Sequence, residues 1–315
     1  MTTLDSPPLV EKSYDPHLFL PLEQDLAASE AISAPSLTFR EDAWRRFYRN
    51  KIALFGLITL FLLSIFAIVG PLFSSHPYYE TNLALKNHPP NGTFWFGTDD
   101  LGRDMFTRVC SGARISLFVG ISAALIDLVI GVLWGGVAAL TGGKLDNLLM
   151  RIADILYAIP YLLVVIMLMV VMGSGLVPIL IALTFTGWIG MARIVRGQIM
   201  QLKEQEYILA VTALGAGYRR ILFKHLIPNA LGPIIVTMTL TIPIAIFTEA
   251  FLSFLGLGVQ APMASWGTMA SDGLPAMRFY AWRLFFPAFF ISITMLSFNL
   301  VGDGLRDALD PKLRK

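Results

Sequence analysis

Three acidic residues lie within or beside long apolar stretches of the sequence, at Asp127, Asp154 and Glu249. A carboxylate in such a stretch can bind a coupling ion, or it can pair with a nearby base or hydroxyl group. Asp154 follows Arg151 by three residues, and an i, i+3 ion pair is the favoured interpretation. No partner for Asp127 can be identified. For Glu249, a gate or pathway role and a structural hydrogen bond are equally open.

The residue pattern supports no other chemistry. The four histidines are scattered without ligand spacing, and Cys110 is the single cysteine, which excludes an internal disulfide or a C-x-x-C pair. The nearest run to a phosphate-binding loop, Gly142-Gly143-Lys144-Leu145, lacks the hydroxyl residue that would hold Mg²⁺. We therefore expect no catalytic residue, no metal site and no cofactor bound by this chain, which is not predicted to be an enzyme.

The composition indicates a membrane protein. Of the 315 residues, 55% are hydrophobic and only 15% are charged, and the mean hydropathy is +0.65. Soluble globular chains carry about 25% charged residues. The net charge of +2 is too small for a nucleic-acid-binding surface, so membrane lipid is expected around the chain and nucleic acid is not an expected partner.

Hydropathy predicts an all-α integral membrane protein with six spans. The first, residues 52–73, has 22 residues and no charge, and a helix of that length reaches about 33 Å, enough to cross the hydrocarbon core. The other apolar stretches are 114–141, 152–172, 176–192, 227–256 and 284–302. A tight turn at Gly173-Ser174-Gly175 is expected to join the third and fourth spans.

Small and aromatic residues in these spans have structural explanations. Gly131 and Gly135 favour close helix packing, with a lining role in a transport route as the alternative. Trp95, Trp266 and Trp282 fall beside outer span ends, where interfacial aromatic residues are common.

Six spans place both termini on one side, and the basic residues indicate which side that is. With the termini in the cytoplasm, 18 of the 24 Lys and Arg residues are cytoplasmic, in accord with the positive-inside rule. Residues 74–113 and 258–282 then face outward. The predicted organisation is a cytoplasmic tail over 1–51, the first span, an outer segment over 74–113, a five-helix core over 114–304 with a cytoplasmic loop at 193–226, and a short cytoplasmic tail over 305–315.

The N-terminal tail divides into two parts. The first 38 residues show no hydrophobic period and are expected to be disordered. From about Phe39, apolar residues such as Trp44 and Phe47 recur at helical spacing while four arginines take the other face. This pattern predicts a basic amphipathic helix suited to an anionic membrane surface. A charged stop beside the first span is the alternative.

The cytoplasmic loop at 193–226 has a pattern of its own. An apolar stripe on a short helix is predicted by i, i+3, i+4 and i+7 spacing of Tyr207, Ala210, Val211 and Leu214. Gly215 and Gly217 end that helix, and a second one is expected from Tyr218. Such a helix-turn-helix can receive the surface of another protein or lie against its own bundle, and the periodicity does not separate these alternatives.

The outer segment contains a charged cluster over residues 96–104. Its polar and glycine positions are Gly97, Asp99, Asp100, Gly102, Arg103 and Asp104. Two interpretations are open. The acids can form a solvated turn and an N-cap for the second span, or they can form charge pairs with Arg103 or a partner chain.

Several segments resemble one family of membrane proteins. The run Leu209-Ala210-Val211, then Gly215, then His225-Leu226-Ile227-Pro228 resembles the E-A-A-x3-G-x9-I-x-L-P loop of ABC importer permease subunits. The Glu of that motif is replaced by Leu209, its second Ala by Val211 and its first Ile by His225. The glycine and proline spacing matches.

Three further segments are similar to the peptide-importer branch of that family: 96–104, the run 249–258 followed by Ser265-Trp266-Gly267, and 302–311. Together they resemble the C-type permease subunit of oligopeptide and dipeptide ABC importers, and most closely the oligopeptide one.

The resemblance implies the six-span transmembrane domain of a type I ABC importer, with cytoplasmic coupling helices, in the cell inner membrane. It implies ATPase contact through a loop containing Tyr207, Leu209, Ala210, Val211, Gly215, His225 and Pro228. The implied partners are a homologous second permease, two cytoplasmic ATP-binding subunits that carry ATP and Mg, an extracytoplasmic peptide-binding protein and the peptide itself. Dipeptides, nickel or another small cargo are alternatives, and an ion-coupled secondary transporter is the rival class.

Overall fold

The computed structural model describes residues 38–310, in which the chain is helical apart from turns, loops and one isolated bridge between Thr98 and Asp104. Residues 41–315 group into one compact unit, of which residues 41–310 are described. The disorder expected for the first 38 residues concerns positions that, except for Thr38, lie outside the described residues.

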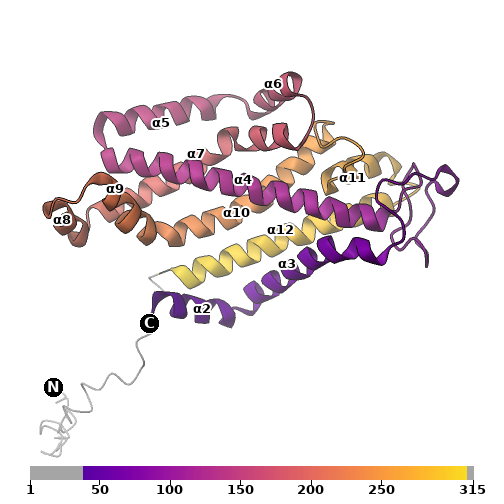
Figure 1. The fold of residues 1–315 in the computed structure, drawn as a ribbon, viewed down its shortest axis with the longest axis horizontal. Coiled ribbons are helices and arrows are strands. Elements are labelled where there is room, and N and C mark those ends of the chain that lie inside the picture. Colours follow the sequence, from indigo (N-terminus) through magenta and orange to yellow (C-terminus); the bar gives the residue numbers. More distant parts are fainter. Residues whose placement is uncertain (1–37, 311–315) are drawn as a thin grey trace, which may run out of the picture. The chain divides into compact units, whose positions relative to one another are not determined.

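Five long helical segments carry the fold: α3 (Lys51–Val69) continued by the 3-10 turn η2 (Gly70–Phe73), α4 (Met105–Thr141), α7 (Leu176–Lys203), α10 (Ile227–Phe254) and α12 (Trp282–Leu309). The shorter elements are α2 (Phe39–Arg49), η3 (Leu83–Leu85), α5 (Gly143–Ala158), α6 (Tyr161–Met172), α8 (Glu206–Ala213), α9 (Tyr218–Arg220), the π-helical turn η4 (Ile221–Leu226), α11 (Trp266–Gly273) and η5 (Leu274–Ala276). Figure 1 shows α3, α12, α10 and α4 side by side, with α7 along α4.

Five of these segments are long and apolar enough to cross a membrane, and a sixth span exists if α5 and α6 are counted as one. The third predicted span, 152–172, is not a single straight helix, because α5 and α6 meet at an angle of 80°. Pro160 causes this break. Ile159 before it is extended, as residues preceding proline prefer, and Pro160 has no N–H to continue the helical ladder.

The second span begins earlier than predicted. The helix starts at Met105 rather than at residue 114, because the Asp104 side chain accepts hydrogen bonds from the N–H groups of Phe106 and Thr107. The last nine residues of the predicted outer segment 74–113 are therefore helical. Similarly, α7 runs on to Lys203 and α12 to Leu309, because hydropathy marks the apolar part of a helix and not its ends.

Close packing explains the glycines of the second span. A Cβ on Gly131 would lie 2.6 Å from the Cβ of Met191, and one on Gly135 would meet the carbonyl oxygen of Ala192. Gly187 of α7 likewise leaves room for the Asp127 carboxylate. The packing interpretation of Gly131 and Gly135 is thus confirmed. At these two glycines α4 and α7 meet almost backbone to backbone, and we call this contact the glycine seam.

The seam makes a direct prediction about stability. Gly135→Ala should lower the free energy of unfolding by about 1–3 kcal/mol, because the added methyl group forces α4 away from the backbone of α7. Thermal unfolding of the purified chain in detergent measures this. The matched control is Gly190→Ala on α7, where an added Cβ meets nothing within 4 Å. Equal melting temperatures for the two variants would contradict the seam as described.

Candidate functional site

The cytoplasmic loop predicted at 193–226 starts later than expected, because residues 193–203 continue α7, and the helix-turn-helix occupies residues 206–226. α8 ends at Ala213, and Gly215 then adopts φ +81°, a conformation that favours glycine. The N–H of Ala216 donates to the carbonyl of Val211 and closes the turn at 3.2 Å. Gly215 is therefore the turn residue between two short helices, as the sequence predicts.

One face of α8 is anchored in the bundle and the other is free. Ile208 is only 2% exposed and packs with Val211 and Ala216 into a core that includes Leu222 and Ile199. The residues of the predicted stripe divide between the faces: Val211 faces this core, whereas Tyr207, Ala210 and Leu214 are exposed, Leu214 to 86%. Leu209 is exposed as well. The interpretation that this helix lies against its own bundle is therefore confirmed for one face. The interpretation that it receives another protein stays a prediction for the exposed face.

The second half of the helix-turn-helix adds positive charge to this free face. Gly217, Arg219, Arg220, Phe223 and Lys224 line an open hollow of about 600 Å³. The chain then makes a π-helical turn through His225, whose carbonyl accepts a hydrogen bond from the Asn229 side chain at 2.6 Å. Pro228 stands in the first turn of α10. Local π geometry is rare and often occurs at functional sites, and no signal in the sequence marks it.

Polar bonds attach the base of this helix-turn-helix to the bundle. Lys203 Nζ donates to the carbonyls of Ala139 and Leu140 at the end of α4, at 3.3 and 3.1 Å. Arg196 forms two hydrogen bonds of 2.6 Å with the Asp146 carboxylate of α5. Neither link is visible in the sequence, because each joins residues at least 50 positions apart.

The partner expected for Asp154 is wrong. Its carboxylate pairs with Arg193 of α7 at 2.8 Å, and no ion pair with Arg151 is formed within the described part of the chain. The Arg193 guanidinium also lies over the ring of Tyr157, 4.7 Å from its centre. The neighbouring helix α7 thus supplies the base, which spacing along α5 alone could not indicate.

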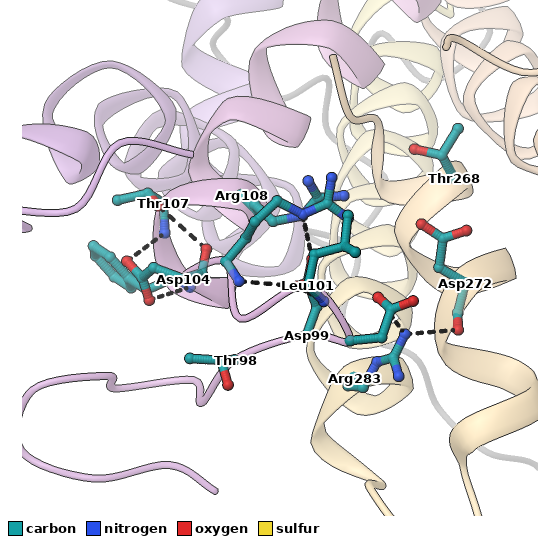
Figure 2. Close-up of polar contacts among 12 residues, drawn as sticks. Thr98, Asp99, Leu101, Asp104, Thr107, Arg108, Thr268, Asp272 and Arg283 are labelled. Carbon is teal, nitrogen blue, oxygen red and sulfur yellow. Dashed lines mark hydrogen bonds and ion pairs between the residues drawn. The ribbon is translucent and has the colours of Figure 1, made fainter. Parts of the chain in front are cut away.

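At the opposite end of α4, Asp99 is the centre of the charged cluster. Its carboxylate accepts hydrogen bonds from the N–H groups of Leu101 and Arg103, both at 2.9 Å, and from Arg103 Nε at 2.7 Å. Arg108 Nε of α4 lies 3.4 Å from the same carboxylate. Figure 2 shows Asp99 and Arg108 beside Asp272 of α11 and Arg283 of α12. Asp99, Arg103 and Arg108 are all buried.

The two interpretations of the cluster apply to different acids. Charge pairing describes Asp99, whereas capping describes Asp104, which also accepts a hydrogen bond from Ser74 at 3.0 Å. Gly97 and Gly102 have φ values of +74° and +71° and lie against the carbonyls of His88 and Asn82. A side chain at either glycine would strike backbone, so both are required for the shape of this segment.

The cluster is also bonded to α11 and α12. Arg283 of α12 donates to Asp100 at 3.0 Å and to the Asp272 carbonyl at 3.2 Å, and Trp282 Nε1 donates to the Thr98 carbonyl. Partial burial raises the pKa of Asp272, and the neighbouring guanidinium of Arg108 lowers it by a smaller amount. Trp266 is not the interfacial residue expected, because it is fully buried and donates to the Val109 carbonyl.

Glu249 is fully buried at the meeting point of three helices. Its carboxylate accepts hydrogen bonds from Ser253 at 2.8 Å and from Ser265, the N-cap of α11, at 2.6 Å. Ser116 of α4 lies at 3.5 Å and accepts a hydrogen bond from the Trp266 N–H. Asp127, by contrast, has a carboxylate oxygen without a hydrogen-bond partner. No group of His, Cys, Asp and Glu residues arranged to hold a metal occurs in residues 38–310.

Two family matches cover most of the chain. Residues 128–315 match the family described as binding-protein-dependent transport system inner membrane component. Residues 38–90 match the N-terminal TM domain of oligopeptide transport permease C. Together they include the helix-turn-helix, α11, α12 and the first span, whereas the charged segment 96–104 and Arg108 lie between the two matched ranges.

Curated relatives and one solved structure agree with these matches. The chain is 61% identical over 299 residues to the oligopeptide transport system permease protein OppC of Bacillus subtilis, covering 95% of this chain and 98% of that protein. It is 59% identical to the dipeptide transport system permease protein DppC of the same organism, covering 91% and 90%. An inward-facing structure of the MetNI methionine ABC transporter aligns with a TM-score of 0.55 at 21% identity, over 65% of this chain and 98% of that one.

The charged cluster predicts unequal effects of two similar substitutions. Asp99→Asn should lower the free energy of unfolding by about 3 kcal/mol, because it leaves Arg108 buried without its counter-charge. Asp104→Asn should lower it by less than about 1 kcal/mol, since asparagine caps a helix nearly as well as aspartate. Thermal unfolding of the two purified variants separates these roles. A larger loss for Asp104→Asn would reverse them.

Proposed function

The chain belongs to the family of binding-protein-dependent transport system inner membrane components, and from that premise we propose that it forms one half of the pathway of an ATP-driven oligopeptide importer. The family resemblance stated from the sequence is confirmed by the match over residues 128–315. The fold, with five long apolar helices and a bent pair, is that of a multi-span permease. Relatives named for oligopeptide and dipeptide transport support peptide as the cargo, with dipeptides as the second candidate.

The free face of α8 and α9 carries the proposal for energy coupling. Leu209, Leu214 and Tyr218 are large, apolar and exposed, and the basic hollow lies next to them. A surface of this mixed character suits a protein partner better than lipid or water. We assign it to a cytoplasmic ATPase subunit, which we expect to supply the ATP and Mg site. A second permease and an extracytoplasmic binding protein complete the importer.

The described contacts support a mechanical route from that surface. α8 is tied through Ile208 to the core and follows α7, and α7 is packed on α4 along the glycine seam. The outer end of α4 bears the charged cluster and meets α11. Movement of an ATPase against α8 would therefore shift α7, α4 and the outer contacts together, which is what alternating access at the permease interface needs.

For Glu249, the structural hydrogen bond is the interpretation that the contacts favour. Its bond to Ser265, the N-cap of α11, supports a role in holding α11 against α10 rather than direct contact with cargo. The acid expected of an ion-coupled transporter would instead face a water-filled route.

The coupling role of Gly215 can be tested by two substitutions. Gly215→Leu and Gly215→Ala share the strain of φ +81°, about 1–2 kcal/mol, but only leucine adds bulk on the free face. We expect Gly215→Leu to abolish peptide uptake in cells while the chain is still inserted, and Gly215→Ala to retain most of it. Wild-type uptake by Gly215→Leu would exclude close docking at the turn. Equal loss in both variants would assign the defect to backbone conformation.

The orientation proposed from the basic residues, with both termini cytoplasmic, has a separate test. In a Cys110→Ala background, a cysteine at Lys86 should react with a membrane-impermeant thiol reagent in intact cells, and a cysteine at Tyr218 should not. Both positions are exposed on the chain, so accessibility depends on the side of the membrane. Labelling of the Tyr218 position from outside would overturn the orientation and the ATPase assignment with it.

A further inference from the structure

The short helix α2 is anchored to the bundle through the side chain of Phe47. Phe47 is 3% exposed and packs with Ala53, Val301 and Ala308. A Cβ added to Gly304 of α12 would clash with the Cβ of Ala53 and would lie 3.4 Å from the Phe47 ring, so this glycine allows the first span to approach α12 closely beside Phe47. Asn50 alone separates α2 from the first span, and its side chain caps that span. α2 is therefore fixed beside the point where the chain enters the membrane.

The opposite side of α2 has no partner within the described part of the chain. Trp44 and Tyr48 are 57% and 49% exposed, and their rings meet edge to face at 4.8 Å. Arg45 and Arg49 are also exposed, and neither takes part in an ion pair among the described residues. Arg46 differs from them because it pairs with Asp42 at 3.0 Å. The outward residues Trp44, Arg45, Tyr48 and Arg49 form the aromatic–arginine face of this helix.

This arrangement changes the sequence-based description of α2 in one respect. The apolar residues do not form a single membrane-facing side, since Phe47 packs on the protein. What remains is two amphipathic aromatic rings and two unpaired guanidinium groups, one turn apart. Tyrosine and tryptophan favour the headgroup level of a bilayer, and arginine binds phosphate through paired hydrogen bonds.

We propose that the aromatic–arginine face binds the headgroups of anionic phospholipids at the cytoplasmic surface of the membrane. Charge complementarity and position select this occupant. The exposed residues Ile52 and Phe55 of α3 follow directly as apolar side chains of the first span, so the face lies at the level where headgroups begin. The exposed face of α8, in contrast, begins ten residues or more along the chain after the apolar part of α7 ends. It therefore does not lie directly beside the headgroup level. The inference rests on the proposed orientation and not on the identity of the cargo.

Fluorescence quenching by lipid tests this inference on the full chain. The purified chain is reconstituted in vesicles of phosphatidylcholine and phosphatidylglycerol at 7:3, in which one lipid or the other is brominated near the headgroup. The signal of Trp44 is the difference between wild type and Trp44→Phe. We expect brominated phosphatidylglycerol to quench this signal more strongly per mole than brominated phosphatidylcholine. In the variant R45Q/R49Q that preference should fall by roughly fivefold for each charge removed.

A matched variant separates local recognition from overall charge. K144Q/R306Q removes two exposed basic residues assigned to the same side of the membrane, and it should keep the wild-type preference. Equal quenching by the two lipids, or an unchanged preference in R45Q/R49Q, would overturn the proposal. Loss of lipid quenching when the ATPase subunits are added would assign the face to a protein instead. Peptide uptake is not measured, so failure of this test leaves the transport assignment intact.

Discussion

The contact between α4 and α7 is the constraint on which the other functional features depend. Because Gly135 and Gly131 bring the two backbones together, we expect both helices to move as one body. The N-terminal end of α4 holds Arg108 in the charged cluster, and its C-terminal end is held by Lys203 of α7. The helix-turn-helix follows Lys203 by three residues. The charged cluster and the exposed face of the helix-turn-helix are thus joined through one seam of small residues.

Proline interruptions in these helices show how backbone carbonyl groups find hydrogen-bond donors in an apolar medium. Pro71 cannot donate to the Ala67 carbonyl, and Arg114 of α4 replaces that donor at 2.6 Å while also reaching the Ile68 carbonyl at 2.9 Å. Thr237 bonds the carbonyl of Pro233 within its helix. Among the described residues, Asp127, Tyr161 and Thr294 each keep a buried oxygen without a hydrogen-bond partner, and Arg108 keeps two such nitrogens. Breaking the remaining bonds would expose further polar groups to an apolar medium, so we expect whole helices to move rather than unfold locally.

Sequence reasoning was most successful where a property belongs to consecutive residues. Hydropathy located the long apolar helices, and spacing located the turn at Gly215. It failed where the deciding partner is distant. The base for Asp154 is on α7, the anchor of α8 is Ile208 because of the core beneath it, and the different roles of Asp99 and Asp104 depend on where Arg108 lies. The bend at Pro160 was open to prediction, but apolar residues on both sides of it concealed the break.

If α4 and α7 move as one body, any change of shape must occur in the segments that connect them to the neighbouring helices. Gly142 and Gly173 have positive φ, and an added Cβ at Gly173 meets nothing within 4 Å. These glycines connect the pair α5 and α6 to α4 and α7. The pair itself is bent at Ile159-Pro160. Two α5 carboxylates, Asp146 and Asp154, are held by arginines on the C-terminal half of α7. A displacement of α7 would thus be passed to α5 through charge pairs and absorbed at its glycine and proline ends. The bent pair is the part of the bundle best suited to adjust while the seam stays intact.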